Sequence, residues 1–441
     1  MISSTLFRKS LLILGLLALV GAILLAGYLF MFGDNNPSGD GAGSRDLSDD
    51  TIPSSPREEQ AQGPDDDQDT TEGQASDPVE APETLPQLQK VTIAAVGDIM
   101  VHLGQIKGAL TPGDDQGQHY DFSPTFAPIK EYIAAADLAI GNLETTLSGA
   151  DQRYTGYPTF NSPEELAVAL KDVGFDVLVT ANNHSLDRRE VGIIGTIDHL
   201  EEAGILNVGT ARTAAEAGMV TILNVRDIRV ALLAYTYGTN GIPLPQGKPF
   251  MVNLIDWDRI RQDIGAAREQ GADFILTYLH FGSEYQRVPN QTQRDLVDFA
   301  FAQGADIVLG CHPHVLQPWE FRDIEDRSGG GRRVFAIYSL GNFVSGMTRQ
   351  HTDTGIILYI DILKNPDTGD ALLGDVRFVP TWVDRSYSRG TLHYRILPIP
   401  ETLNNRAQGI YDPLLTEEDY RRMEQALQET LSMYETDEPA P

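Results

Sequence analysis

Apolar runs that end in short polar motifs recur along residues 91–400, and the spacing of the apolar positions predicts the elements. Strands are expected at 91–96, 137–140, 176–180, 229–235, 273–279, 306–309, 333–338, 355–362 and 375–383. Helices are expected at 163–173 (with Ser162 as N-cap), 189–203, 256–270, 292–303 and 415–432. Strands alternating with helices predict an α/β fold, and the late strand-only segments predict a second sheet or an edge extension.

Polar residues that can bind metal ions follow the predicted strands. They are Asp98; Asn142 and Glu144; Asn183, His184 and Asp187; His280 and Glu284; and His312 and His314. Ligands of open α/β sheets gather at the carboxyl ends of the strands, so these side chains are expected to form one site. Asp, Asn and His are the ligands that a two-metal phosphoesterase-type site would use.

Several of these residues have a simpler interpretation. In an extended segment His312 and His314 would point to the same side, but both could also be surface histidines. His280 ends a strongly apolar run and could be a buried histidine with satisfied hydrogen bonds. Asp98, taken alone, could be a turn former. The metal interpretation is favoured because the motifs share their position at strand ends.

In the segment around His184, different residues are predicted to have different roles. The Asn183 oxygen can bind a metal ion, while His184, oriented by Asp187, can stabilise charge on a substrate oxygen or protonate a leaving group. The alternative is that Asn182, Asn183 or Asp187 caps the helix that begins near Arg189.

Asn142 and Glu144 are predicted to share one strand face, from which either could bridge two metal ions. Glu144 is favoured because a carboxylate bridges better than an amide.

The N-terminal region is predicted to attach the chain to a membrane. Leu11–Phe32 is almost uninterruptedly apolar, long enough to span a bilayer, and follows Arg8 and Lys9. Positive-inside logic predicts a single-pass, uncleaved signal-anchor in the cell membrane, with the C-terminal domain extracellular. Residues 33–88 contain 15 acidic residues and are expected to be a disordered linker. The expected domains are therefore 1–32 (cytoplasmic stub and anchor), 33–88 (linker), 89–400 (folded domain) and 401–441 (C-terminal helix and acidic tail).

Composition narrows the choice of partners. The formal net charge is −30, which argues against a nucleic-acid partner. A polyanion would need a bound metal ion or local positive charge, for which Arg153, Arg188, Arg189 and Arg294 are candidates. The single cysteine, Cys311, cannot form an intrachain disulfide.

The motifs AAVGDIM, GNLETTLS, ANNHSLD, LHFGSEY, GCHPHVLQPWE and YSLGNFV together resemble the CapA-type poly-γ-glutamate capsule synthesis proteins, a family of the calcineurin-like metallophosphoesterase superfamily. The resemblance implies a four-layer α/β/β/α sandwich with two divalent metal ions, whether Mn, Fe, Zn or Mg. It implies one metal ion at Asp98, Glu144 and His314, and the other at Glu144, Asn183, His280 and His312. His184 and Asp187 would be the catalytic pair.

The sequence also departs from the superfamily pattern. Met100 stands where the first motif commonly has a histidine, and His102 follows two residues later. Asn142 stands in the place of the bridging Asp. His102, Asn142 and Glu284 are therefore additional candidates. Two classes of function fit this sequence: a membrane-tethered metal-dependent hydrolase, or a non-catalytic accessory subunit that binds poly-γ-glutamate or the synthase subunits.

Overall fold

The computed structural model describes residues 88–114, 117–325, 330–388 and 390–434. Together they lie in one compact unit, which begins at Pro86. The expected membrane anchor and nearly all of the expected linker lie outside the described residues. Among the helices that are described, none is long and apolar enough to cross a membrane.

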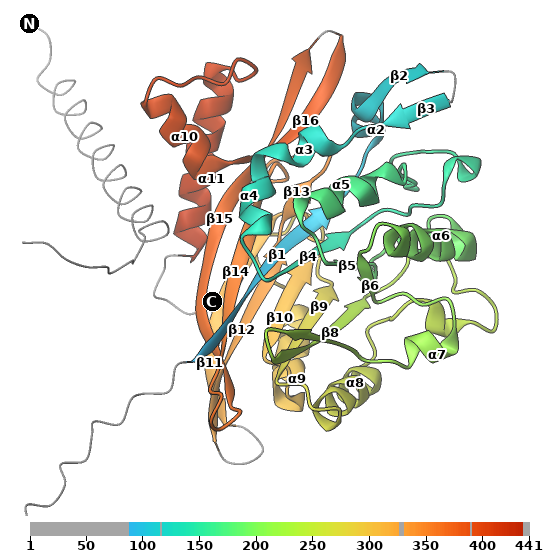
Figure 1. Cartoon of the computed structure of the whole chain (residues 1–441), viewed down its shortest axis with the longest axis vertical. Coiled ribbons are helices and arrows are strands. Elements are labelled where there is room, and N and C mark those ends of the chain that lie inside the picture. The colour runs from blue at the N-terminus through green and yellow to red at the C-terminus, as the bar shows by residue number, and fades with distance from the viewer. Residues whose placement is uncertain (1–87, 115–116, 326–329, 389, 435–441) are drawn as a thin grey trace, which may run out of the picture. The chain divides into compact units, whose positions relative to one another are not determined.

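Two large β-sheets form the centre of the molecule (Figure 1). The first has the order β16-β15-β14-β1-β4-β5-β6, with β13 beside β1. Its strands are β1 (Gln89–Ile99), β4 (Leu138–Leu143), β5 (Val177–Val179), β6 (Leu206–Val208), β13 (Asn342–Val344), β14 (Thr354–Lys364), β15 (Ala371–Ser388) and β16 (Thr391–Pro398). The second has the order β11-β12-β10-β9-β8-β7. Its strands are β7 (Thr221–Val225), β8 (Ile228–Thr236), β9 (Phe274–His280), β10 (Ile307–Cys311), β11 (Leu316–Glu325) and β12 (Gly331–Leu340).

The helices connect and cover these sheets. They are α2 (Leu103–Ala109), α3 (Ser123–Phe126), α4 (Lys130–Ala134), α5 (Glu165–Val173), α6 (Arg189–Glu202), α7 (Ala214–Ala217), α8 (Trp257–Glu269), α9 (Gln291–Gln303), α10 (Ile399–Ala407) and α11 (Glu417–Tyr434). A small hairpin of β2 (Leu110–Asp114) and β3 (Gly117–Tyr120) follows α2. Three-residue 3₁₀ helices occur at Ala127–Ile129, Ala150–Gln152 and Pro249–Met251.

The hydrophobic clusters define the layers. Val91, Ile93 and Ala95 of β1 pack against apolar residues of the second sheet. Ala94 and Val96, on the opposite face of β1, pack against α3, α4 and α5. A third cluster lies between the outer face of the second sheet and α8 and α9. The order is therefore helix, sheet, sheet, helix. Because β1 is covered on both faces, it reads in the sequence as a continuous apolar run.

The predicted α/β class is confirmed, and every expected strand and helix is present with shifted ends. The predicted N-cap of α5 is wrong: Glu164 occupies the N-cap position. The Ser162 hydroxyl instead lies 2.8 Å from the Thr145 hydroxyl. Its backbone N–H donates to Thr146 O, so Ser162 joins the strand-end loop rather than the helix.

Strand register brings the motifs together at the carboxyl ends of the strands in each sheet. Asp98 at the end of β1 is paired with Asn142 of β4 and with Asn342 of β13. In the second sheet His280 is paired with Cys311 and Thr236. The approach of β13 to β1 requires glycine at position 97, because a Cβ there would lie 1.9 Å from Gly341 O.

Candidate metal centre

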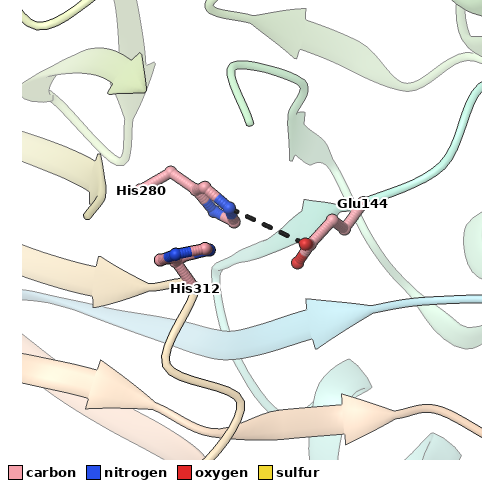
Figure 2. Close-up of side chains that lie close together, drawn as sticks. All are labelled: Glu144, His280 and His312. Carbon is pink, nitrogen blue, oxygen red and sulfur yellow. Dashed lines mark ion pairs between the residues drawn. The ribbon is translucent and has the colours of Figure 1, made fainter. Parts of the chain in front are cut away.

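Three groups of buried and rim side chains bring metal-binding atoms within 4.8 Å of one another. One group is Asp98, Glu144 and His314, and a second is Glu144, His280 and His312 (Figure 2). The third is Glu284, His312 and His314. Glu144 belongs to the first two groups, and all members except the exposed Glu284 are buried. These are the residues that the sequence predicted as ligands, apart from Asn183, which is described below.

Glu144 lies between the two ligand groups. Its Oε1 atom is 3.7 Å from His280 Nε2 and 3.9 Å from His314 Nε2. This oxygen is fully buried and has no hydrogen-bond partner. A buried carboxylate oxygen without a partner carries a large desolvation penalty, which a cation bound between the two groups would remove.

The protonation preferences of the histidines also suit a metal ion. Burial, together with the charge of His312, lowers the pKa of His280 well below its usual value. Burial and the charge of His314 lower the pKa of His312 to about 3. Both imidazoles are therefore neutral at physiological pH, as metal binding requires. His312 Nδ1 is buried and has no hydrogen-bond partner, so its lone pair is available to an ion.

The pKa values of Asp98 and Glu144 are shifted in opposite directions. Burial tends to raise the pKa of Asp98, but the hydrogen bond and charge of His314 outweigh it and lower the pKa. The hydrogen bond joins His314 Nδ1 and Asp98 Oδ2 at 2.9 Å. Burial, reinforced by the charge of Asp98, raises the pKa of Glu144 well above its usual value. Glu144 therefore needs a nearby positive charge to stay ionised at neutral pH.

His312 and His314 converge by a different backbone route from the one expected. The sequence predicts an extended segment here, but the φ angles are +98° at His312 and +59° at His314. Both lie in the left-handed region, which non-glycine residues occupy uncommonly. The ring centroids are 5.9 Å apart, and both side chains are buried, so the alternative of surface histidines is wrong.

His280 is buried and hydrogen-bonded, as the alternative interpretation expected. Its ring is buried and makes hydrogen bonds, with Nε2 2.9 Å from Asn183 Oδ1 and Nδ1 3.4 Å from Asn142 Nδ2. However, the partners are themselves candidate ligands. Asn142 also donates to Asp98 Oδ1 at 2.8 Å. Asn142 and Asn183 are therefore within the site, next to the His and carboxylate ligands.

His184 and Asp187 form a buried pair beside the ligand groups. His184 Nδ1 is 2.7 Å from Asp187 Oδ2, which also accepts a hydrogen bond from Phe160 N at 2.6 Å. The capping alternative is wrong because Arg188 is the N-cap of α6 and makes no side-chain cap. His184 Nε2 lies 3.4 Å from Asn240 Nδ2, and Asn240 Oδ1 accepts from Asn183 Nδ2, which links the pair to the metal centre.

Four residues support the site in roles that the sequence did not predict. Asn182 donates to Asn142 Oδ1 and to Leu143 O. Asn342 Oδ1 lies 3.1 Å from His314 Nδ1. The ring of Tyr237 is 4.6 Å from that of His312, and the ring of Phe160 is 4.7 Å from that of His184. Asn182 and Asn342 lie within the motifs ANNHSLD and YSLGNFV, so their part in the site could have been predicted from the sequence. The contacts of Tyr237 and Phe160 depend on how distant loops converge and leave no signal in the sequence.

His102 lies outside all three ligand groups. It is the residue before α2, and its Nδ1 accepts a hydrogen bond from Gly346 N at 3.0 Å. Its ring packs edge-on against Phe160. His102 therefore contacts the loop at Gly346 and is not part of the ligand groups.

The candidate substrate-binding arginines are dispersed. Arg188 donates to the backbone oxygens of Gln152, Thr159 and Arg153, so it holds a loop. Arg294 lies over the ring of Tyr338. The Arg153 side chain is exposed. For these three, substrate binding stays a prediction.

Comparisons with known proteins show which family the chain resembles. A family model described as bacterial capsule synthesis protein PGA_cap matches residues 92–347. Capsule biosynthesis protein CapA of Bacillus anthracis is 29% identical over 305 residues, which are 66% of this chain and 68% of that protein. PGA biosynthesis protein CapA of Bacillus subtilis (strain 168) is 29% identical over 284 residues, which are 62% of this chain and 68% of that protein.

The solved structures that match the chain include NAD nucleotidase (NadN) of Haemophilus influenzae, with a TM-score of 0.42 and 11% identity over 79% of this chain and 64% of that one. Another is the calcineurin-like phosphoesterase YfkN of Bacillus subtilis, with a TM-score of 0.36 and 14% identity over 78% of this chain and 99% of that one. Both TM-scores are below 0.5, so neither likeness supports a conclusion about this chain. The family match spans more than half of the chain and includes every predicted metal ligand. The chain therefore belongs to the bacterial capsule synthesis protein family PGA_cap.

Proposed function

We propose that this protein acts in poly-γ-glutamate capsule synthesis or export, outside the cell and anchored by its N-terminal segment, through a metal-dependent hydrolase site. The observation that carries the proposal is the buried, unpartnered Glu144 Oε1 between two groups of ligands. The names of the two Bacillus relatives support the role in capsule synthesis.

Two sets of residues would hold the metal ions. Asp98, Glu144 and His314 would hold one, and Glu144, Asn183, His280 and His312 the other. Two divalent ions would supply a nucleophilic water at neutral pH and would neutralise charge on the substrate.

The remaining chemistry falls to His184 and Asp187. Asp187 accepts the Nδ1 proton of His184 and fixes the ring, which leaves Nε2 to hold or deliver a proton at a substrate oxygen. Phe160 restrains the pair from both sides, because its N–H binds Asp187 and its ring packs on His184. This arrangement suits protonation of a leaving group.

Activity and metal content of the purified full-length chain test the proposal. The wild type, loaded with Mn²⁺, Zn²⁺ or Mg²⁺, is assayed on phosphomonoester, phosphodiester and γ-glutamyl substrates. His184→Ala should lower kcat by about 10²–10⁴-fold while retaining the metal ions, because His184 lies outside the ligand groups. His312→Ala should lose both metal and activity. His199→Ala, at the α6 histidine that binds Leu147 O, is the matched control.

A wild type that binds no metal and turns over none of these substrates would contradict the hydrolase. If it nevertheless bound the polymer or a synthase subunit, the accessory role would replace it.

A further inference from the structure

An exposed arginine lies at the rim of the metal centre. The Arg349 guanidinium carbon is 4.1 Å from the centroid of the Tyr285 ring, which in turn is 6.1 Å from that of His314. The Arg349 side chain is exposed, and its guanidinium lies over the Tyr285 ring. Its charge is therefore available to a ligand beside the metal centre.

Tyr285 has a fixed position under this arginine. Its φ angle is +64°, a left-handed conformation that is costly for a tyrosine. Its N–H donates to Pro313 O at 2.8 Å, and Pro313 lies between the two ligands His312 and His314. The ring that supports Arg349 is therefore tied to the ligand motif itself.

The loop that carries Arg349 is held at several points. His102 Nδ1 accepts from Gly346 N, and Arg385 donates to Met347 O at 2.8 Å. Asn342 Nδ2 donates to Thr352 O at 3.0 Å, while its Oδ1 faces His314 Nδ1. Since Asn342 contacts both the loop and a ligand, the positions of the loop and the metal centre are coupled. A preorganised loop binds a ligand without first having to be ordered.

We propose that Arg349, stacked on Tyr285, is the subsite that receives a free carboxylate of a γ-glutamyl chain next to the metal centre. This rests on the proposed function and names the group that the site recognises. A glutamate chain joined through its γ-carboxyl groups retains one free α-carboxylate per internal residue. The planar guanidinium binds a carboxylate with two parallel hydrogen bonds.

This assignment also explains how so acidic a protein can hold a polyanion. The net charge of −30 gives no general attraction, so local cations must supply it. The Arg188 guanidinium donates hydrogen bonds to backbone oxygens, whereas Arg349 is exposed and contacts the face of the Tyr285 ring.

Binding of a fluorescein-labelled oligo-γ-glutamate to the full-length chain tests the subsite, with and without removal of metal ions by EDTA. Arg349→Ala should weaken binding about ten-fold in both states, as expected for loss of a charge-assisted hydrogen bond. Arg349→Lys should bind with intermediate affinity, because lysine keeps the positive charge but lacks the planar guanidinium that makes two parallel hydrogen bonds. Arg333→Ala is the matched control, since Arg333 is an exposed arginine stacked on Phe321 at 4.9 Å, in the half of β12 remote from Asn342. It should bind like the wild type.

A methyl-esterified oligomer provides a second readout, because it lacks the free carboxylates. The wild type should bind it about as weakly as Arg349→Ala binds the acid form. Equal binding of the acid form by wild type and Arg349→Ala, equal binding of acid and ester by the wild type, or no binding at all would overturn the subsite. Arg349-dependent binding without turnover would support the subsite and contradict only the hydrolase.

Discussion

Glu144 has an environment that fits a metal ligand better than a structural carboxylate. It is buried, its Oε1 has no hydrogen-bond partner, and burial raises the pKa of its carboxyl group well above the usual value. Since the folded-state pKa is raised, the stability associated with the protonated form is present at low pH and is lost as pH rises through that pKa. Without metal, an ionised Glu144 is therefore unfavourable at neutral pH.

We expect Glu144→Gln to separate metal binding from stability. The amide keeps the shape but removes the charge that two ligand groups share, so bound metal measured by plasma mass spectrometry should fall below one ion per chain. In the metal-free state the melting temperature at pH 7 should be no lower than that of the wild type, because a buried charge is removed. Glu284→Gln, at the exposed member of the third group, should retain two ions. Two ions retained in Glu144→Gln would refute the shared-ligand interpretation.

The sequence allowed the ligands to be predicted but not their supports. Asp98, His280 and the His312–His314 pair stand out because polar side chains follow apolar strands. Tyr285 and Arg349 do not, since their roles depend on a left-handed backbone at Tyr285 and on a loop that closes over it. Such long-range loop packing leaves no periodic signal in the chain.

Among the elements, the strands missing from the sequence prediction include the short hairpin of β2 and β3, β13 beside β1, and the edge strands β6, β7, β11 and β16. β11 lies at the end of the second sheet and contains Pro318, which lacks an N–H for the ladder. Its burial alternates weakly and its outer half is largely exposed, so it lacks the apolar run of β10. The longer central strands such as β1 and β9 were predicted because both of their faces are covered and they read as apolar runs.

An ion pair between Arg422 and Asp353 attaches α11 to the chain before β14. Arg422 of α11 makes two hydrogen bonds to Asp353, at 2.9 and 2.7 Å, just before β14. Burial tends to raise the pKa of Asp353, but the hydrogen bonds and charge of Arg422 outweigh it and lower the pKa. The resulting stability is present above the usual Asp value of 3.8 and is lost as pH falls toward the lowered pKa.

Arg422→Ala should lower the free energy of unfolding by about 2 kcal/mol at pH 7, measured by urea denaturation. The difference from the wild type should shrink as the pH is lowered below about 4. Arg421→Ala removes the neighbouring exposed arginine of the same helix and should change stability little. A difference between wild type and Arg422→Ala that stays constant down to pH 2 would argue against an ionised Asp353 as the partner.

At the scale of the whole molecule, composition and fold divide the chain near residue 86. The compact unit begins at Pro86, and residues 33–88 have the composition of an acidic, disordered linker. The change in composition predicts a boundary at residues 88–89, and the alternating elements predict the α/β class, whereas the four-layer sandwich was implied by the resemblance to a known family. The sequence did not show which strands join which sheet, because that pairing depends on contacts between distant segments.

Limited proteolysis of the full-length chain with a Glu-specific protease tests the boundary. Cleavage should occur first between residues 58 and 83, at the glutamates of the expected linker, and leave a resistant fragment that retains its metal ions. Early cuts within residues 88–434 would show that the folded unit is less stable than its core indicates.

Anomalous diffraction from crystals of the chain grown with Mn²⁺ tests the shared metal centre most directly. We expect two anomalous peaks about 4 Å apart, as in two-metal sites, with the Glu144 carboxylate between them. His314 and Asp98 should lie beside one peak, and His280 and His312 beside the other. A single peak, or two peaks that do not share Glu144, would contradict the shared metal centre.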